Sequence, residues 1–474
     1  MRARDRASRR LRHKGSAAPA APAGDAACGH DAGTAIALRR GTRCASTGAD
    51  AFRLAVEGQV TSAAPSAGDE MRVEGVSLAA IAERFGTPCY VYSRAALEQA
   101  WRDFDAAFAG LPHLVCYAVK ANSNLAVLNL FARLGSGFDI VSGGELARVL
   151  AAGADASKVV FSGVGKTESE MTEALAAGIH CFNVESAAEL AVLDRVAGRA
   201  GRRAPISIRV NPDVDPRTHP YISTGLKESK FGVAFAEARD LYRRAAGLAH
   251  IAIRGIDIHI GSQISELGPY REAALKVLDL VDRLAEDGIA IEHVDLGGGL
   301  GIRYRDEVPV TALDYAAMAR ELMRGRRESL LLEPGRRLVG EAGLLLTRVL
   351  YLKPGTERNF AVVDAAMNDL IRPVLYDAWH PVAPVRPRPG PTRRYQIVGP
   401  ICESADFIAH DRDLALESGD LIAIGAAGAY AFAMSSNYNS RPRACELIVD
   451  GDRVHVARSR ETIADLFALE KPLR

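Results

Sequence analysis

Several polar side chains that could do chemistry follow short apolar runs, where a buried strand would deliver them into a pocket. Lys120 comes at the end of one run, His259 and a triple glycine follow two others, and Glu333 opens a Glu-Pro-Gly-Arg segment. A lysine amine can bind a carbonyl covalently, and bare glycine backbone can approach a phosphate. Each motif alone has an ordinary explanation: a solvated strand end, a core histidine, a turn, or a glutamate paired with a nearby arginine. Their recurrence after similar runs favours one shared site.

The elements that would position these side chains are repeated βα units. Between about residues 112 and 335, short β-rich runs alternate with stretches whose apolar residues recur every three or four positions. This pattern predicts an α/β protein with a (β/α)8 barrel, whose chemistry lies on the loops after the strand carboxyl ends. The expected strands are 114–119, 138–141, 159–161, 181–184, 206–211, 255–260, 293–296 and 330–332, and the expected helices include 145–151, 168–176, 187–197 and 270–284. The polar residues at or next to the strand ends are Lys120, Asp139, Ser142, Glu185, Asn211, His259, Gly298 and Glu333.

After residue 336 the helical rhythm stops, and short alternating strands predict a second, C-terminal β-rich domain. Strands are expected at 344–352, 395–398, 420–424 and 446–456, and the Pro- and Arg-rich stretch 381–394 is expected to be a surface loop. We divide the chain into a disordered tail or misplaced start (1–70), an N-terminal segment that joins the β domain (71–93), the barrel (94–340) and the β-rich domain (341–474).

Composition limits the classes of partner. Hydrophobic residues make up 48% and charged residues 25%, as in an ordinary globular protein, and the net charge is +1. Nothing in this balance favours nucleic acid or a membrane surface as a partner, and no apolar run approaches the roughly 18 residues that span a bilayer. The seven cysteines show neither a CxxC pair nor a metal-ligand spacing, so we expect no metal and a reducing, cytoplasmic location. The basic start could instead be a transit peptide.

Residues 71 to 465, on these motifs, resemble the fold-type III pyridoxal-phosphate-dependent decarboxylases, and most closely the diaminopimelate decarboxylase family. The resemblance implies an alanine-racemase-like barrel and pyridoxal phosphate bound through the amine of Lys120. It places His259 on the cofactor ring and Glu333 beside the ring nitrogen, where an arginine would be expected in a racemase. The cofactor-binding residues that it implies are Lys120, Asp139, His259, Ser262, Gly298, Gly299, Glu333, Pro334, Gly335, Arg336 and Tyr430.

The resemblance also implies the substrate and the second catalytic residue. Cys402, in Gly-Pro-Ile-Cys-Glu-Ser, matches the family's proton donor, and a thiol is mostly protonated at neutral pH. Glu403 matches the ligand of the substrate's distal ammonium. The expected substrate-binding residues are Arg336, Arg372, Tyr376, Glu403 and Tyr430. Because a guanidinium pairs with a carboxylate through two hydrogen bonds, the arginines suit the distal carboxylate of diaminopimelate.

The expected reaction is decarboxylation of meso-2,6-diaminopimelate to L-lysine and carbon dioxide, the last step of lysine biosynthesis. A decarboxylase of another basic amino acid, such as lysine, ornithine or arginine, stays open as an alternative, and so does a non-catalytic pyridoxal-phosphate protein. Burial at a strand end is expected to favour the neutral amine of Lys120. The resemblance further implies a homodimer with shared active sites, in which the Cys402 segment comes from the partner subunit.

Overall fold

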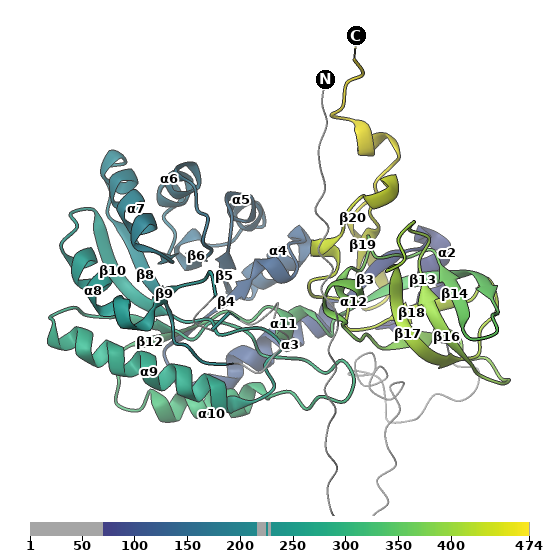
Figure 1. Cartoon of the computed structure of the whole chain (residues 1–474), viewed down its shortest axis with the longest axis horizontal. Coiled ribbons are helices and arrows are strands. Elements are labelled where there is room, and N and C mark those ends of the chain that lie inside the picture. Colours follow the sequence, from purple (N-terminus) through teal and green to yellow (C-terminus); the bar gives the residue numbers. More distant parts are fainter. Residues whose placement is uncertain (1–69, 216–223, 226–228, 474) are drawn as a thin grey trace, which may run out of the picture. The chain divides into compact units, whose positions relative to one another are not determined.

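The computed structural model describes residues 70–215, 224–225 and 229–473, which contain a helix-lined barrel and a β-rich assembly (Figure 1). The expectations for residues 1–69 lie outside this range. Eight parallel strands pair in the order of the sequence, and β10 pairs with both β8 and β11, which closes the barrel. The eight strands are β4 (His113–Ala118), β5 (Gly137–Ile140), β6 (Val159–Phe161), β7 (Cys181–Val184), β8 (Ala204–Asn211), β10 (Ile251–Asp257), β11 (His293–Asp295) and β12 (Ser329–Leu332). The prediction of a (β/α)8 barrel is confirmed.

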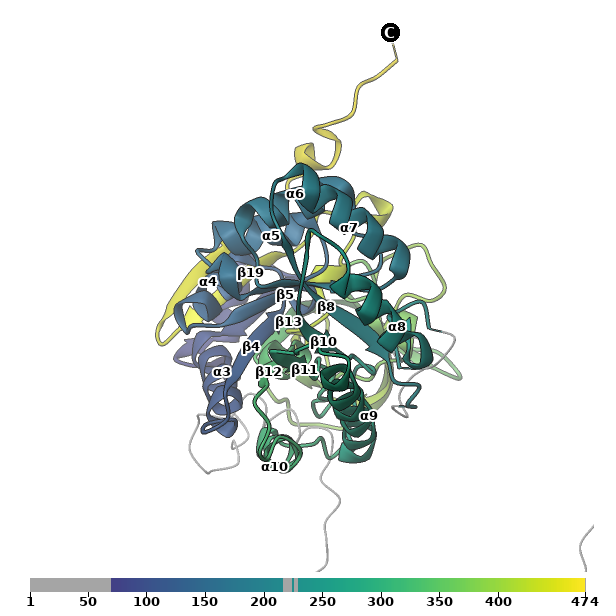
Figure 2. The same ribbon diagram turned by 90° about the vertical axis from the view of Figure 1, so that its left-hand side faces the viewer.

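Helices surround the barrel strands, as the view along the barrel shows (Figure 2). They are α3 (Arg94–Ala107), α4 (Leu125–Arg133), α5 (Gly143–Ala151), α6 (Glu168–Ala177), α7 (Ala187–Arg199), α8 (Phe235–Ala246), α9 (Leu267–Glu286) and α10 (Ala312–Leu322). The short strand β9 (Val233–Ala234) extends the edge of β8. The apolar faces of the helices share one large core with the strands, which includes Phe131, Phe161, Leu193 and Leu284.

Side-chain caps explain why several helices begin directly after a strand end. Ser142 accepts a hydrogen bond from the backbone of Glu145 and begins α5, and Ser186 does the same for α7. Thr167 and Glu170 cap each other's backbone at the start of α6. Such caps satisfy backbone N–H groups that the first helical turn leaves free. These caps fix the short loops that follow β5, β6 and β7.

The β-rich assembly is a second sheet with an N-terminal strand in its middle. β3 (Cys89–Ser93) lies between β13 (Gly343–Lys353) and β19 (Cys445–Asp450), antiparallel to the first and parallel to the second. The helix α2 (Leu78–Phe85) contributes Leu78 and Ile81 to the apolar cluster on this sheet. The other strands are β14 (Asn359–Val363), β15 (Val382–Pro384), β16 (Arg393–Val398), β17 (Phe407–Leu414), β18 (Leu421–Ile424) and β20 (Arg453–Arg458), and the pair β1 (Arg72–Val73) and β2 (Val76–Ser77) precedes α2.

Two local expectations for this sheet were wrong. The run 446–456 is a hairpin of β19 and β20, because Gly451 adopts a φ of 62° at the first loop residue between Asp450 and Arg453. A glycine at that position suits the tight turns that join antiparallel strands. Residues 382–384, expected in a surface loop, form β15, which pairs with β18.

Hydrogen bonds hold the β-rich assembly against the loop after β4. The N–H of Tyr430 donates to the carbonyl of Ala121 at 2.8 Å, and the side chain of Asn122 donates to the carbonyl of Gly428 at 3.2 Å. Asn124 donates to the buried carboxylate of Glu446 at 2.9 Å. The loop that carries Lys120 is therefore held next to the segment that carries Tyr430.

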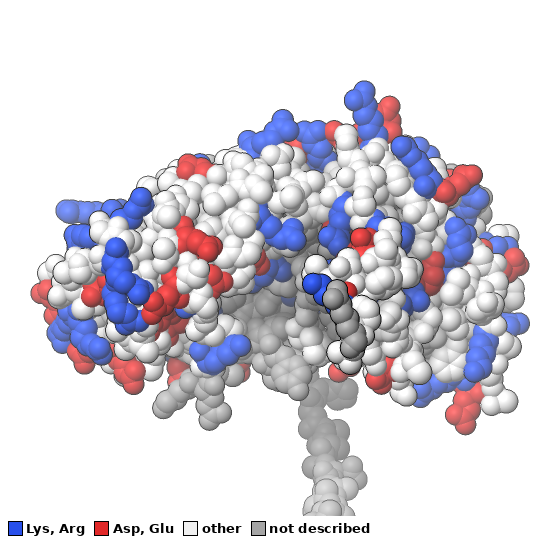
Figure 3. Space-filling model, turned by 90° about the horizontal axis from the view of Figure 1, so that it is seen from above, with Lys and Arg blue, Asp and Glu red and all other residues white. Residues whose placement is uncertain are grey.

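The outer surface offers no extended region of one charge on the face shown in Figure 3, where acidic and basic side chains are interspersed. In the described ranges, every helix is too short or too polar to cross a membrane.

Candidate active site

Lys120 and its carboxylate partner lie at the carboxyl ends of adjacent strands. Lys120 is in a single 3-10 turn, Val119–Ala121, directly after β4, and Asp139 is in β5. The Nζ atom of Lys120 donates to Oδ2 of Asp139. Asp139 is fully buried, while a third of the lysine side chain stays exposed. The pair holds the amine at the mouth of the barrel, where a small molecule could reach it.

The charge of this amine differs from the sequence expectation. Burial lowers the pKa of Lys120, as expected, but the carboxylates of Asp139 and Glu333 outweigh that effect and raise the pKa above its usual value. The expectation of a neutral amine was therefore wrong for the protein without a ligand. The sequence showed the burial but not the two acids that face the same Nζ atom.

A cluster of buried carboxyl groups lies beside Lys120. Asp139, Asp257, Asp295 and Glu333 are each at most 4% exposed. One oxygen of each aspartate is buried without a hydrogen-bond partner among the described residues. Burial, together with repulsion from Asp139 and Asp295, raises the pKa of Glu333 well above its ordinary value. The cluster contains more acids than the cations Lys120 and Arg209 offset, so it suits a ligand group that carries a positive charge.

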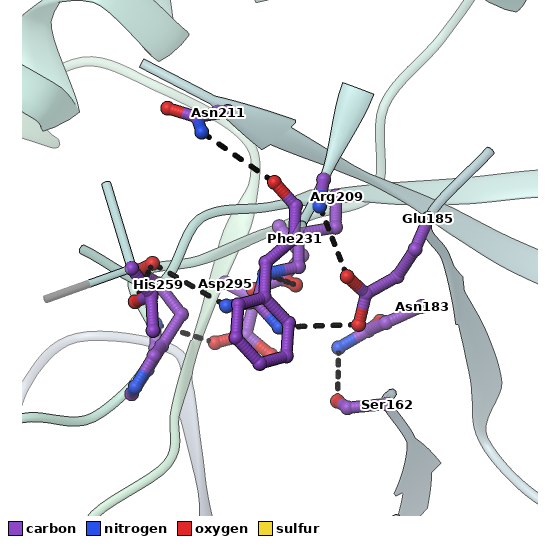
Figure 4. A network of polar contacts seen from close by, with 12 residues as sticks. Ser162, Asn183, Glu185, Arg209, Asn211, Phe231, His259 and Asp295 are labelled. Atoms are coloured by element: carbon purple, nitrogen blue, oxygen red, sulfur yellow. Dashed lines mark hydrogen bonds and ion pairs between the residues drawn. The ribbon is translucent and has the colours of Figure 1, made fainter. Parts of the chain in front are cut away.

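Arg209 ties the cluster to the neighbouring strand ends (Figure 4). Its Nη1 donates to Glu185 at 3.1 Å, its Nη2 donates to the carbonyl of His259 at 3.4 Å, and its guanidinium lies 4.9 Å from the ring centre of Phe231. Glu185 also accepts the backbone N–H of Gly163 at 2.8 Å. Arg209 thus connects Glu185 and His259, two of the polar residues expected at the strand ends.

The imidazole of His259 is fixed and uncharged. Its Nδ1 accepts the N–H of Gly298 at 3.1 Å, so a neutral ring carries its proton on Nε2. Burial and the positive charges of Arg209 and Lys120 lower the pKa of His259 well below its usual value. A neutral ring in a set orientation can pack against another planar ring.

The triple glycine is required by close backbone approach. A Cβ on Gly298 would lie 2.1 Å from the carbonyl oxygen of Glu333, and one on Gly297 would lie 2.3 Å from that of Ile258. The N–H of Gly297 donates to Asp295, and that of Gly298 donates to His259. Two of the three amides expected to face a phosphate are thus engaged within the protein, so Gly299 is the member of the triplet best suited to that role.

Arg336 and Arg372 form the opposite feature, a pair of buried cations. Both are 5% exposed, and neither forms an ion pair with a carboxylate of the described residues. Arg336 donates to the hydroxyl of Tyr304 at 2.6 Å and to that of Ser262 at 3.0 Å. Arg372 lies 4.6 Å from the ring centre of Tyr304. Because a buried charge without a counter-charge is costly, this pair is suited to anionic ligand groups.

Two tyrosines complete this region. Tyr430 takes a left-handed φ of 54° and lies with its ring centre 4.8 Å from the guanidinium of Arg336. Its hydroxyl also lies next to Gly335. Tyr376 is in the same short helix as Arg372, α12 (Arg372–Tyr376), and it is close enough to act on the pKa of that arginine. The structure thus brings the two expected tyrosines to the arginine pair.

Cys402 and Glu403 stand apart from this constellation. Both side chains are exposed, and neither makes a hydrogen bond or an ion pair with Lys120, Glu333 or Arg372. Their loop is fixed by Asp406, whose carboxylate accepts the N–H groups of Met367 and Ile401. Within one chain, the expected proton donor is therefore an ordered surface residue.

Several residues of the site were not identified from the sequence. Asp257 and Asp295 end barrel strands inside segments that the sequence analysis singled out, and strand-end position was the signal that could have selected them. Tyr304 and His380 come from loops that meet only in the folded chain, so no spacing could have found them. The five are Arg209, Asp257, Asp295, Tyr304 and His380.

Comparison with known proteins agrees with this geometry. Residues 94–340 match a family described as pyridoxal-dependent decarboxylase, pyridoxal binding domain. The diaminopimelate decarboxylase of Pseudomonas aeruginosa is 62% identical over 404 residues, 85% of this chain and 97% of the relative. That of Vibrio cholerae is 56% identical over 405 residues, 85% of this chain and 97% of the relative.

Solved structures give the same assignment. Diaminopimelate decarboxylase of Helicobacter pylori complexed with L-lysine is 43% identical, with a TM-score of 0.80, over 83% of this chain and 98% of that chain. A lysine/ornithine decarboxylase from Vibrio vulnificus is 23% identical, with a TM-score of 0.70, over 79% of this chain and 97% of that chain, and shares the fold. Barrel and site define a pyridoxal-dependent decarboxylase. Within that class, the chain belongs to the diaminopimelate decarboxylase family.

The cofactor of this class is pyridoxal phosphate, and the buried groups fit its three chemical requirements. Lys120 offers an amine for the aldehyde. The unpartnered carboxyl oxygens around Glu333 suit a protonated ring nitrogen. Arg336, Ser262 and Gly299 offer a cation, a hydroxyl and a backbone amide at the other end. The fit therefore rests on an acid-rich end and an arginine-rich end.

Proposed function

We propose that this chain decarboxylates meso-2,6-diaminopimelate to L-lysine and carbon dioxide. The observation that carries the choice of substrate is the pair of buried guanidiniums, Arg336 and Arg372, without a carboxylate partner in the described residues. Diaminopimelate has a second amino acid centre with its own carboxylate. Lysine and ornithine lack that group and would leave a buried cation unpaired.

Residues at different positions of the site have different roles. Bound pyridoxal phosphate supplies an electron sink for the carbon–carbon bond that breaks as carbon dioxide leaves. Lys120 holds the cofactor, Asp139 fixes the Nζ atom, and Glu333 keeps the ring nitrogen protonated. His259 packs on the ring, and Ser262, Gly298, Gly299, Pro334, Gly335, Arg336 and Tyr430 are the proposed residues around the phosphate and ring.

Arg372, Tyr376 and Glu403 are the proposed ligands of the distal end of the substrate, with Arg336 and Tyr430 shared between cofactor and substrate. Carbon dioxide carries away the carboxyl carbon. The carbon to which it was bonded keeps the electron pair of the broken bond. The thiol of Cys402 donates its proton to that carbon, and solvent then restores the thiol proton. The net change is the replacement of one carboxyl group by hydrogen.

We further propose that the active enzyme is a homodimer in which Cys402 and Glu403 reach the site of the partner subunit. The exposed position of both side chains on an ordered loop supports this arrangement. We retain the division into a tail (1–70), a joining segment (71–93), a barrel (94–340) and a β-rich domain (341–474). We also propose a cytoplasmic location, which the five described, unpaired cysteines support.

One experiment tests the proposed reaction. Purified protein loaded with pyridoxal phosphate is incubated separately with meso-diaminopimelate, lysine, ornithine and arginine, and carbon dioxide release is measured. We expect release from meso-diaminopimelate at a rate far above the others. Equal rates with lysine or ornithine would reject the substrate while leaving the decarboxylase class in place.

A further inference from the structure

His380 makes two hydrogen bonds that together define its tautomer. The residue is fully buried and follows α12. Its Nδ1 lies 3.0 Å from the carbonyl oxygen of Gly425, and its Nε2 lies 2.8 Å from Nη1 of Arg372. A carbonyl can only accept, so Nδ1 carries the hydrogen. The lone pair of Nε2 is then left to accept from the guanidinium.

The surroundings of His380 keep this imidazole neutral. Burial lowers its pKa well below the usual value, and the charges of Arg372, Arg336 and Arg412 act in the same direction. A protonated ring would present a hydrogen to the guanidinium in place of a lone pair. The contact with Arg372 therefore exists only with the neutral ring.

A neutral acceptor differs physically from the usual partner of a buried arginine. A carboxylate would orient Arg372 and would also cancel its positive charge. The imidazole orients the guanidinium and leaves that charge available. On its other side, Arg372 lies 4.6 Å from the ring centre of Tyr304, whose ring meets that of His380 edge-on at 5.3 Å. Arg372 is thus held by an imidazole and a phenol ring, neither of which carries a negative charge.

We propose that His380 is a positioning residue that orients Arg372 without neutralising it, and so selects substrates with a distal carboxylate. This inference rests on the proposed function of Arg372 as the ligand of that carboxylate. Preorganised arginines bind a carboxylate at a smaller cost in side-chain freedom than mobile ones. Losing a hydrogen bond to a charged group typically weakens binding by about 10- to 100-fold.

Two variants separate the hydrogen bonds from the volume of the ring. His380→Phe keeps a planar ring against Tyr304 and removes both hydrogen bonds. His380→Gln keeps an oxygen for Arg372 and an N–H for Gly425. His410→Phe is the matched control, because His410 is exposed and its side chain hydrogen-bonds only Gln396 among the described residues. All are compared as cofactor-loaded enzymes in KM and kcat for meso-diaminopimelate and in two inhibition constants. One is for L-lysine, which keeps the distal carboxylate after decarboxylation, and the other is for cadaverine, a diamine without a carboxylate.

We expect His380→Phe to raise KM for meso-diaminopimelate by about 10- to 100-fold and to weaken inhibition by L-lysine by a similar factor, with little change in kcat, in cofactor binding or in inhibition by cadaverine. His380→Gln should restore most of the affinity, and His410→Phe should behave as wild type. An unchanged KM in His380→Phe would overturn the proposal. An equal loss of cadaverine and diaminopimelate binding would also overturn it, since it would indicate general collapse of the pocket.

A measurement without substrate distinguishes this proposal from the proposed function. If His380→Phe fails to fold, His380→Gln must still bind meso-diaminopimelate nearly as wild type does, and a large loss overturns the proposal. If wild type does not decarboxylate diaminopimelate at all, the proposed function fails. The nitrogen NMR signals of the Arg372 side chain then test whether His380 orients Arg372. Distinct, slowly exchanging signals in wild type that merge in His380→Phe support this role. Identical spectra of the two proteins reject it.

Discussion

The two ends of the site contrast in charge. At the barrel end, four buried acids surround Lys120 and Arg209, and three carboxyl oxygens have no hydrogen-bond partner among the described residues. At the end next to the β-rich domain, two buried guanidiniums have tyrosine, serine and histidine partners but no carboxylate partner among the described residues. One end has an excess of carboxyl groups and the other an excess of guanidinium groups.

The difference teaches how the site distinguishes the parts of its ligands. An acid-rich end attracts a protonated ring nitrogen, and an arginine-rich end attracts phosphate and carboxylate groups. Neither imbalance is stabilising by itself, because a buried charge without a partner costs free energy. Removing charge at one end should therefore change a different kinetic parameter than removing charge at the other.

The largest effect is expected where the acid end meets the cofactor. Lys120→Ala should lose the visible absorbance of the bound cofactor and several orders of magnitude in turnover, because no other described amine is held at that point. Absorbance spectra and borohydride reduction followed by peptide mapping measure this. Lys158→Ala, which changes a partly exposed lysine bonded to the carbonyl of Gly135, is the control. Trapping of the cofactor on a different lysine would show that the assignment is wrong.

At the arginine end, Arg372→Ala should lower kcat/KM for meso-diaminopimelate by about 100- to 10,000-fold. An unpaired buried charge costs about 3 to 5 kcal/mol, and 1.4 kcal/mol corresponds to about tenfold. Any residual activity on lysine should fall much less, since lysine that reacts at its own α-carbon has no second carboxylate at the distal end. Steady-state kinetics on both substrates provide the measurement, with the surface variant Arg348→Ala as control. Similar losses of activity on diaminopimelate and lysine would mean that Arg372 does not bind the distal carboxylate.

Cys402→Ala should lower kcat by about 100- to 10,000-fold, the range for general acid catalysis, and leave cofactor affinity unchanged. The thiol acts on the substrate carbon after carbon dioxide has left, and belongs to neither charged end. Cofactor titration and kcat are measured together, with Ser404→Ala from the same loop as control. If turnover stays at the wild-type level, the proton comes from another group, and Lys120 becomes the candidate.

At the acid end, Glu333→Gln should lower kcat by about 10- to 100-fold, because an amide cannot hold the ring nitrogen protonated as a carboxylate does. KM for diaminopimelate should change little, in contrast to His380→Phe at the arginine end. The amide can still meet Asn183 and Ser162, which contact Glu333 in the wild type. Glu321→Gln on the surface is the control, and a KM effect as large as the kcat effect would contradict the division between the ends.

The last effect leaves turnover aside and concerns the stability of the fold against pH. Burial raises the pKa of Asp295 to about 7, although the N–H of Gly297 favours its ionised form. The unfolded chain loses this proton near its ordinary value of about 3.9, so the folded chain holds more protons between pH 4 and 7. Stability must then fall as pH rises through that window, by up to about 4 kcal/mol for this group.

Asp295→Asn should remove most of that decline in the cofactor-free protein, because an amide does not titrate. Urea unfolding at pH 5 and pH 8 gives the two free energies, with the exposed Asp452→Asn as control. A decline of the same size in Asp295→Asn and wild type would show that other carboxyl groups of the cluster lose their protons in this pH range.

Much of this site could be predicted because the barrel is periodic. Strand and helix periods predict where each strand ends and so place Lys120, His259 and Glu333 at one end of the barrel. Their chemical roles were implied by the family resemblance. The charge of Lys120 could not be predicted, since it depends on how near Asp139 and Glu333 come to its Nζ atom. Their mutual distances depend on strand stagger, which the sequence pattern does not state.

Contacts made by irregular segments were beyond the sequence pattern. Tyr304 and His380 have no periodic neighbours, and only folding brings them to Arg336 and Arg372. The hairpin turn at Gly451 was missed because its two strands read as one continuous alternating run. Local patterns thus gave strand identity and direction, while the orienting contacts came from tertiary structure.

The central place of β3 in the second sheet has a consequence for biosynthesis. Cys89–Ser93 leaves the ribosome before the whole barrel, yet both of its neighbours, β13 and β19, are encoded after it. At synthesis rates of about 5 to 20 residues per second, this apolar strand waits on the order of tens of seconds for a pairing partner. During that time the nascent chain exposes a strand edge that can pair with other chains. Chaperone dependence of newly made protein should therefore centre on this strand, and a chain that ends before Cys445 would leave one of its edges open.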